Sequence, residues 1–125
     1  MKGACLCGAV GFEVAPEVAA GITAAAACHC GQCRKQSGHV WASFNAPREA
    51  LTITGSPRWY QSSAHARRGF CPGCGAFLFW EEAGNPEISV SAGALEAPTG
   101  LTLTRHIFTA DKGDYYEIDD GVPQS

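Results

Sequence analysis

The sequence predicts an all-β domain. Three observations carry this prediction: short segments with strand-like apolar patterns, Gly and Pro turn signals at regular spacing, and no long run of helical periodicity. Short strands that are separated by such turns are typical of all-β domains. The chain has 125 residues, which suffices for one domain with a buried core, so we expect a single domain over residues 1–125.

Nine segments have strand character, because each carries an alternating or continuous apolar pattern and is bounded by turn residues. They are residues 10–14, 22–27, 40–44, 51–54, 58–61, 66–70, 76–80, 88–91 and 101–108. The alternation is clearest in 101–108, whereas 76–80 is apolar throughout and is expected to be buried either on both faces or against a second sheet. A short edge strand is also expected over 115–118.

Turn residues and one short helix connect these strands. Pro16 ends the first strand, and the Gly55-Ser56-Pro57 and Gly84-Asn85-Pro86 tripeptides mark later turns. Residues 32–37 are good helix formers followed by Gly38, which predicts a single helical turn. Aromatic side chains bury much apolar area, so those of the strands are expected to supply most of the core. They are Phe12, Trp41, Phe44, Trp59, Phe77, Phe79, Trp80 and Phe108.

Three cysteines lie within six residues in the motif Cys28-His29-Cys30-Gly31-Gln32-Cys33. In an extended chain alternate residues point the same way, so Cys28 and Cys30 face one point while His29 faces away. Gly31 allows the turn that brings Cys33 back to that point. Three thiolates are one ligand short of a closed zinc shell, and a site of that kind leaves a position for water or substrate.

The other four cysteines form two pairs, Cys5-Leu6-Cys7 and Cys71-Pro72-Gly73-Cys74. The second pair has the form of a zinc knuckle, with a tight Pro-Gly turn between its cysteines. Two pairs make a closed tetrahedral site, the usual arrangement for structural zinc. One closed and one open site account for all seven cysteines, so we expect two zinc ions per chain.

Two alternatives compete with this interpretation. The first alternative is that the cysteines form disulfides. Their odd number and the absence of a signal-peptide pattern argue against it and favour a cytoplasmic protein with reduced thiols. The second alternative is that the three-cysteine cluster is another closed structural site, completed by His29, His39, His65 or His106. A histidine near the cluster, His29 or His39, is otherwise a candidate proton shuttle or an ordinary hydrogen-bonded residue.

The charge balance limits the class of partner. A net charge of −3 argues against bulk attraction to nucleic acid or to anionic membranes, and no apolar run approaches membrane-spanning length. Two basic pairs lie beside cysteines: Arg34-Lys35 follows Cys33, and Arg67-Arg68 precedes Cys71. Such cations can hold a small acidic molecule by its carboxylates, so Arg34 and Lys35 are candidate substrate-binding residues.

The motifs resemble one known family. The segments Gly3-Ala4-Cys5-Leu6-Cys7-Gly8-Ala9-Val10, Cys28-His29-Cys30-Gly31-Gln32-Cys33-Arg34, Ser37-Gly38, Phe70-Cys71-Pro72-Gly73-Cys74-Gly75 and Ala92-Gly93-Ala94-Leu95 are similar to the glutathione-dependent formaldehyde-activating enzymes, also called the centromere protein V domain family. The resemblance implies a β-tent fold of antiparallel sheets, a structural zinc on Cys5, Cys7, Cys71 and Cys74, and a catalytic zinc on Cys28, Cys30 and Cys33. It also implies a carbon–sulfur lyase activity that joins formaldehyde and glutathione to S-hydroxymethylglutathione.

The residues by themselves support related chemistry. A thiol substrate binds an open zinc as its thiolate, and a bound thiolate can attack a carbonyl carbon or leave from it. Our first hypothesis is therefore a zinc-dependent carbon–sulfur lyase whose partner is a small thiol such as glutathione. The alternative is a non-catalytic zinc-binding module that docks a protein partner through a sheet face.

Overall fold

The structure, a computed structural model, describes all 125 residues, Met1–Ser125, and consists of two β-sheets that pack face to face. A three-stranded sheet has the order β1-β2-β5, from Lys2–Ala4, Gly11–Val14 and Leu51–Thr54. A seven-stranded sheet has the order β10-β3-β4-β9-β8-β7-β6. Its strands are β3 (Ala24–Cys28), β4 (Trp41–Pro47), β6 (Arg58–Gln61), β7 (Ala66–Phe70), β8 (Phe77–Glu82), β9 (Glu87–Ser91) and β10 (Thr102–Ile107).

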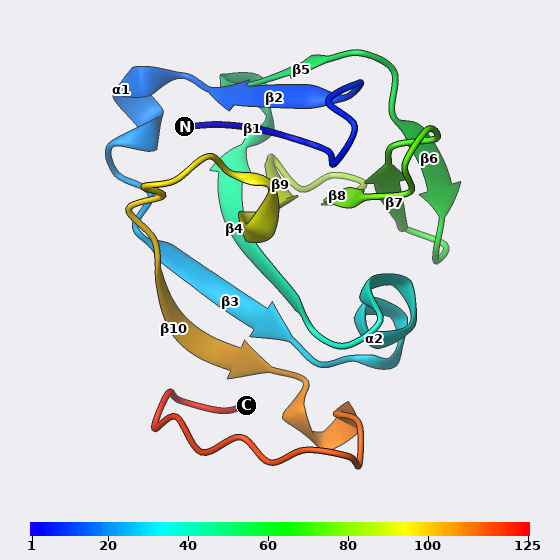
Figure 1. Cartoon of the computed structure of the whole chain (residues 1–125), viewed down its shortest axis with the longest axis vertical. Helices are drawn as coiled ribbons and strands as arrows, with labels where there is room; N and C mark the ends of the chain where they lie inside the picture. The colour runs from blue at the N-terminus through cyan, green and yellow to red at the C-terminus, as the bar shows by residue number, and fades with distance from the viewer.

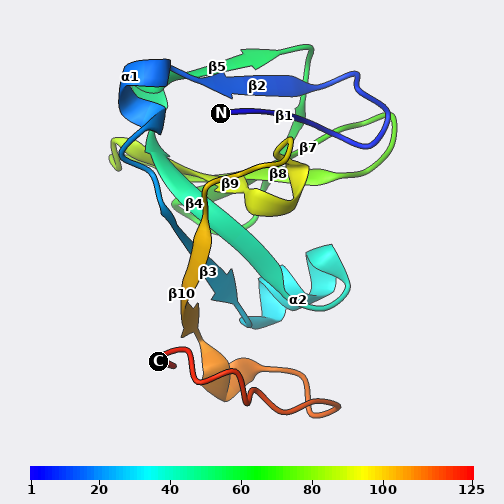
Figure 2. The ribbon, with the colours of Figure 1, turned by 60° about the vertical axis from the view of Figure 1, so that its left-hand side comes forward.

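The small sheet crosses one end of the large one, and β3, β4 and β10 extend away from it (Figures 1 and 2). The two α-helices are short: α1 (Pro16–Ala19) and α2 (Gly31–Ser37). The segment that follows β10 lies at the same end of the molecule as α2, opposite the small sheet. Neither helix is long enough to cross a membrane.

All-β class and antiparallel pairing are confirmed, with one exception. Strand β10 pairs with β3 in parallel, and its register shifts between Leu103 and Arg105. Parallel pairing follows from the route of the chain, because β10 returns from the far side of the molecule rather than through a hairpin. All nine expected strands are present, with ends displaced by a few residues; β4, for example, continues to Pro47.

The sequence patterns missed two elements and wrongly predicted one. Strand β1 is too short to show alternation, and α1 begins at Pro16, which was expected only to end a strand. Proline is well tolerated in the first turn of a helix, so Pro16 can both follow the end of β2 and begin α1. The edge strand expected over 115–118 is wrong: this segment forms a turn and then irregular chain.

The core lies between the two sheets. Large apolar side chains from both sheets form one cluster in which Phe44, Phe79 and Val90 have almost no exposed surface. Phe79 meets Phe12 of the small sheet edge to face, with ring centroids 5.7 Å apart, and stacks on Trp59 at 5.9 Å. Phe108 is not part of this core: it is 57% exposed, because β10 ends just before it and its backbone turns to φ 54°.

The two faces of the large sheet therefore differ in chemistry. Along β4, Phe44 and Ala46 point toward the small sheet, whereas Ser43 and Asn45 point to the opposite face. That opposite face is not covered by a second sheet. It carries a row of cavities, and the three-cysteine cluster lies among them.

Phe79 is expected to be a main contributor to stability, because it contacts both sheets. Phe79→Ala should lower the free energy of unfolding by about 3–5 kcal/mol, since it removes a fully buried ring and leaves a cavity. Tyr60→Ala, which truncates a ring that is 63% exposed on β6, should change stability by only about 0.5 kcal/mol. Urea melts of the two variants test this, and equal losses would contradict the assignment of the core.

Candidate functional site

The four-cysteine cluster joins the N-terminal turn to the knuckle between β7 and β8. The Sγ atoms of Cys5, Cys7, Cys71 and Cys74 all lie within 4.8 Å of one another. The sulfur of Cys7 is 3.7 Å from those of Cys5 and Cys71. Zinc–sulfur bonds of about 2.3 Å at tetrahedral angles place neighbouring sulfurs about 3.8 Å apart, so this set fits one metal ion.

Backbone groups hold these sulfurs in place. The Val10 amide donates to the Cys5 sulfur at 3.3 Å, and the amide of Gly75 donates to the Cys71 carbonyl at 2.8 Å to close the knuckle. Gly75 has φ 79°, the left-handed conformation that glycine adopts without strain. A hydrogen bond from the Ala76 amide lowers the pKa of Cys74 to about 6. The backbone therefore favours the thiolate form of Cys74, one of the four ligands that a metal ion would need.

The three-cysteine cluster forms where β3 ends and α2 begins. The Sγ atoms of Cys28, Cys30 and Cys33 lie within 4.8 Å of one another. Cys30 caps α2, because its sulfur accepts the Cys33 amide at 3.3 Å. All seven cysteines are free thiols in the structure, and no disulfide joins them. The two clusters are those that the spacing predicted, and both can bind a metal.

No histidine completes the three-cysteine cluster. His29 points away from it, as alternation in an extended chain predicted, and both of its ring nitrogens are engaged elsewhere. The cluster instead faces a cavity of about 300 Å³. Besides the three cysteines, side chains from β4, β7 and β8 line this cavity, among them Trp41, Arg68 and Trp80.

Arg68 is the charged group that contacts the cluster. It is only 5% exposed, and its Nη1 lies 3.6 Å from the Cys33 sulfur and 3.3 Å from Gln36 Oε1. A hydrogen bond from the Cys28 thiol, supported by Arg68, lowers the pKa of Cys33 to about 6. The pKa of Cys28 is raised correspondingly, because its proton is shared with Cys33. One thiolate is therefore stable at neutral pH before any metal binds.

Two buried donors on the cavity wall lack partners. They are Nε1 of Trp41, whose ring stacks on Phe77 with centroids 4.2 Å apart, and Nε of Arg68. Buried polar groups are nearly always hydrogen-bonded, so an unpartnered pair points to a ligand or ordered water in the cavity. Sequence reasoning did not single out Trp41, because a tryptophan in a strand is usually a core residue.

The two candidate substrate-binding residues lie on different sides of α2. Lys35 lines a second cavity that is adjacent to the cysteine cavity. Arg34 lines neither cavity, and its charge acts on the Tyr116 hydroxyl instead. Of the second basic pair, Arg68 reaches the cluster, whereas Arg67 donates to Glu81 at 2.6 Å on the exposed side of β7. Alternation along β7 separates these two neighbours.

A chain of hydrogen bonds lies behind the cluster. His29 contacts the Tyr116 hydroxyl through Nδ1 and His106 Nδ1 through Nε2 at 2.8 Å; His106 Nε2 lies 2.8 Å from Asp120 Oδ2. An ionised carboxylate only accepts, so His106 Nε2 donates to it, and the remaining donors then point from Tyr116 toward Asp120. This bond from His106 lowers the pKa of Asp120. Only one indirect signal in the sequence pointed to this hydrogen-bond chain: the alternation that turns His29 away from the cysteines.

Comparisons with known proteins agree with this geometry. The sequence model of the glutathione-dependent formaldehyde-activating enzymes matches residues 1–111. The chain belongs to this family. The family resemblance drawn from the cysteine motifs is therefore confirmed, and with it a relation to glutathione and formaldehyde chemistry.

One solved structure is also similar to this family member. A crystal structure of a Rhodobacter sphaeroides protein has 30% sequence identity and a TM-score of 0.61. The match covers 78% of this chain and 89% of that one. No curated protein matches the chain.

His106 is expected to hold the C-terminal segment against the cysteine loop. His106→Ala should leave His29 and Asp120 without their partners, at a cost of ~1–3 kcal/mol for the buried group. Amides of residues 113–125 should then exchange faster with deuterium, while those of β8 and β9 keep their protection. His65→Ala, which removes an exposed ring in the turn between β6 and β7, serves as the control. Unchanged exchange in His106→Ala would refute the anchoring role.

Proposed function

We propose that the protein is a zinc-dependent carbon–sulfur lyase that acts on thiol–aldehyde adducts such as S-hydroxymethylglutathione. In this proposal residues 1–125 form one domain with two zinc ions. Cys5, Cys7, Cys71 and Cys74 hold a structural ion, and Cys28, Cys30 and Cys33 hold a catalytic one. Free thiols throughout the chain agree with the reducing cytoplasm that we expect as its location.

The observation that carries the proposal is the open side of the three-cysteine cluster. Three sulfurs converge at the wall of a cavity, no fourth ligand from the chain completes them, and a buried cation contacts one of them. The four-cysteine cluster, in contrast, has its full set of ligands. Closed sites are typical of structural zinc, and three-ligand sites are typical of catalytic zinc.

The reaction needs few groups from the protein. When a hydroxymethyl adduct is cleaved, the carbon–sulfur bond breaks and its electron pair stays on sulfur. The hydroxyl oxygen loses its proton and becomes the carbonyl oxygen of the aldehyde, and the sulfur takes up a proton to leave as the thiol. Zinc at this position supplies Lewis acidity and binds sulfur as its thiolate.

The residues of the cavity support this chemistry in three ways. The cysteines provide ligands that are already partly ionised, since the pKa of Cys33 is about 6. The guanidinium of Arg68 offsets the negative charge that three thiolates and a substrate thiolate bring together. The indole of Trp41, stacked on the Phe77 ring behind it, gives the cavity an apolar wall, and its N–H is free to donate to a substrate oxygen.

The two clusters are expected to fail differently when one ligand is removed. Cys71→Ser should lower the melting temperature strongly or abolish soluble expression, because metal binding there contributes to folding and connects distant parts of the chain. Cys33→Ser should leave the fold intact and reduce the zinc content from two ions per chain to one. Elemental analysis and thermal melts of both variants test this. One zinc in the reduced wild-type protein after zinc titration would contradict the two-site assignment.

A small thiol is expected to bind directly at the three-cysteine cluster. In the cobalt-substituted protein, glutathione should change the ligand-field absorption, because sulfur replaces oxygen in the metal shell. Cys33→Ser should abolish the response, because Cys28 and Cys30 alone cannot hold the metal tightly. The same protein should accelerate both formation and cleavage of S-hydroxymethylglutathione.

The outcomes of this titration separate the two hypotheses. A thiol response without turnover of any thiol–aldehyde adduct would reject the lyase assignment and retain the thiol site. Protein that carries both metals yet responds to no thiol would favour the non-catalytic module that docks a protein partner.

A further inference from the structure

We propose that the cavity between β3, β4 and β10 binds the carbonyl half of the thiol–aldehyde adduct, and that this half is an oxo acid, an aldehyde whose carbon chain ends in a carboxylate. The inference rests on the proposed function and replaces formaldehyde with a larger, acidic aldehyde. It assigns contact with the carbon chain to Ala26 and Ser43, and recognition of the carboxylate to Arg105.

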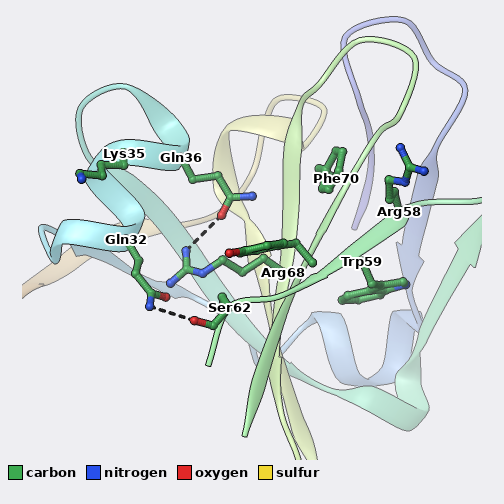
Figure 3. Close-up of a pocket in the computed structure, with 9 residues that line it drawn as sticks. Gln32, Lys35, Gln36, Arg58, Trp59, Ser62, Arg68 and Phe70 are labelled. Carbon is green, nitrogen blue, oxygen red and sulfur yellow. Dashed lines mark hydrogen bonds between the residues drawn. The ribbon is translucent and has the colours of Figure 1, made fainter. Parts of the chain in front are cut away.

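The cysteine cavity has a neighbouring cavity on each side. Through Gln32 and Arg68 it adjoins the cavity between α2 and the β6–β7 hairpin (Figure 3). Elsewhere it shares four lining residues, Ser43 and Trp80 among them, with a third cavity of about 600 Å³. An adduct has a thiol half and a carbonyl half that meet at one carbon–sulfur bond. A cluster with a cavity on each side can therefore hold one half in each.

Strand register places the third cavity one step along the sheet from the cysteines. Cys28 of β3 pairs with Trp41 of β4. Two residues earlier on β3, Ala26 pairs with Ser43 of β4 and with Arg105 of β10. Side chains two positions apart on a strand share a face and are about 6.6 Å apart along it. The row that contains Ala26 is therefore within reach of a short chain whose first carbon is bonded to a sulfur at the cluster.

The third cavity is much larger than formaldehyde requires. The formaldehyde part of an adduct has two heavy atoms, which fill about 60 Å³ if each takes the volume of one water molecule in the liquid. The cavity exists because the side chains on this part of the sheet face are small: Ala24 and Ala26 on β3, Ser43 on β4 and Ser89 on β9. This floor leaves room for a carbon chain.

Trp41 selects which group of the adduct enters the third cavity. Its Nε1 is buried, has no partner and lies on the wall of the cysteine cavity. The reacting carbon of an adduct bears sulfur, a hydroxyl group and the rest of the aldehyde. With the sulfur at the cysteines and the hydroxyl oxygen at Trp41 Nε1, the rest of the aldehyde is the group left to extend into the adjoining cavity. Formaldehyde has only hydrogen in that place.

Arg105 gives the third cavity a positive charge. The lining contains no acidic residue and no other charged residue. Arg105 has no ion-pair partner, whereas Arg48 and Arg67 are paired with Glu81. A guanidinium donates in a fork that matches the two oxygens of a carboxylate. An acidic end on the aldehyde chain is therefore the group that complements this lining.

The bond changes are those of the smaller adduct. The carbon–sulfur bond breaks and its electron pair stays on sulfur, which takes up a proton and leaves as the thiol. The hydroxyl oxygen loses its proton and becomes the carbonyl oxygen of the oxo acid. The chain and its carboxylate take no part in these steps. Ala26, Ser43 and Arg105 therefore act on binding and specificity rather than on bond cleavage.

Three stable thioethers of glutathione test the subsite. S-methylglutathione has nothing to place in the third cavity, and S-butylglutathione carries a neutral four-carbon chain. S-(3-carboxypropyl)glutathione carries a chain of the same length that ends in a carboxylate. None of the three has the hydroxyl group that cleavage needs, so calorimetry with the zinc-loaded protein measures binding alone. Cleavage of S-hydroxymethylglutathione, followed by release of formaldehyde, tests the lyase separately.

We expect the carboxypropyl probe to bind at least about 10-fold more tightly than S-methylglutathione, since each buried methylene contributes about 4-fold. Ala26→Leu fills the cavity and should reduce this advantage to within about 2-fold, because the chain loses its space. Arg105→Gln should reduce the preference for the carboxypropyl over the butyl probe by about 2- to 5-fold, the range for an exposed ion pair.

Two control variants make matched changes outside the third cavity. Ala83→Leu adds the same bulk as Ala26→Leu in the exposed turn between β8 and β9. Arg48→Gln removes the same charge as Arg105→Gln from an arginine that does not line the cavity. Both controls should leave the affinity ratios of the three probes unchanged. Thermal melts of all four variants exclude unfolding as the cause of a loss.

The outcomes separate the subsite from the lyase. Long probes that bind no more tightly than S-methylglutathione, or whose advantage survives Ala26→Leu, overturn the subsite even if S-hydroxymethylglutathione is cleaved. Equal affinities for the butyl and carboxypropyl probes, or a preference that Arg105→Gln leaves unchanged, overturn the assignment of an oxo acid. Losses confined to Ala26→Leu and Arg105→Gln, in a protein that cleaves no adduct, support the subsite and reject the lyase.

Discussion

The fold depends on one constraint, the convergence of four sulfurs, two from the turn between β1 and β2 of the small sheet and two from the knuckle between β7 and β8 of the large sheet. Cys7 and Cys71 are 64 positions apart, yet their sulfurs lie at 3.7 Å. Bringing such distant segments together costs loop-closure entropy, which a shared metal ion can offset. The knuckle that provides Cys71 and Cys74 also connects β7 to β8. The strand that carries Arg68 therefore ends directly at the four-cysteine cluster.

The large sheet separates stability from chemistry by its two faces. Phe44, Phe79 and Val90 point to the small sheet and fill the core. Their strand neighbours Ser43, Trp80 and Ser89 point the other way, onto the face where the cavities lie, and so does Arg68, which pairs with Trp80. Because a strand alternates at every residue, Ser43, Trp80 and Ser89 are each adjacent in sequence to a core residue. The geometry of the cavities thus depends on a rigid core just behind them.

The sequence predicted both cysteine clusters and most of the strands, because ligand spacing and alternation are local signals. It could not show that β10 pairs in parallel with β3, nor that Arg68 lies opposite Tyr60 and Trp80, since both depend on which strands become neighbours. It also assigned Phe108 to the core by its apolar character alone. Burial there is decided by where β10 ends, and the chain turns at Phe108 into solvent.

The motif around His29 links the site to the last residues of the chain. Alternation turns Cys28 and Cys30 toward the cavity and His29 toward His106 and Tyr116. These three consecutive residues at the end of β3 therefore contribute cysteine ligands on one side and a histidine hydrogen bond on the other. Hydrogen bonds that run from His29 through His106 to Asp120 connect the cysteine loop to the C-terminal segment. The C-terminal segment therefore contacts the three-cysteine cluster from behind, and that cluster has one ligand fewer than the four-cysteine cluster.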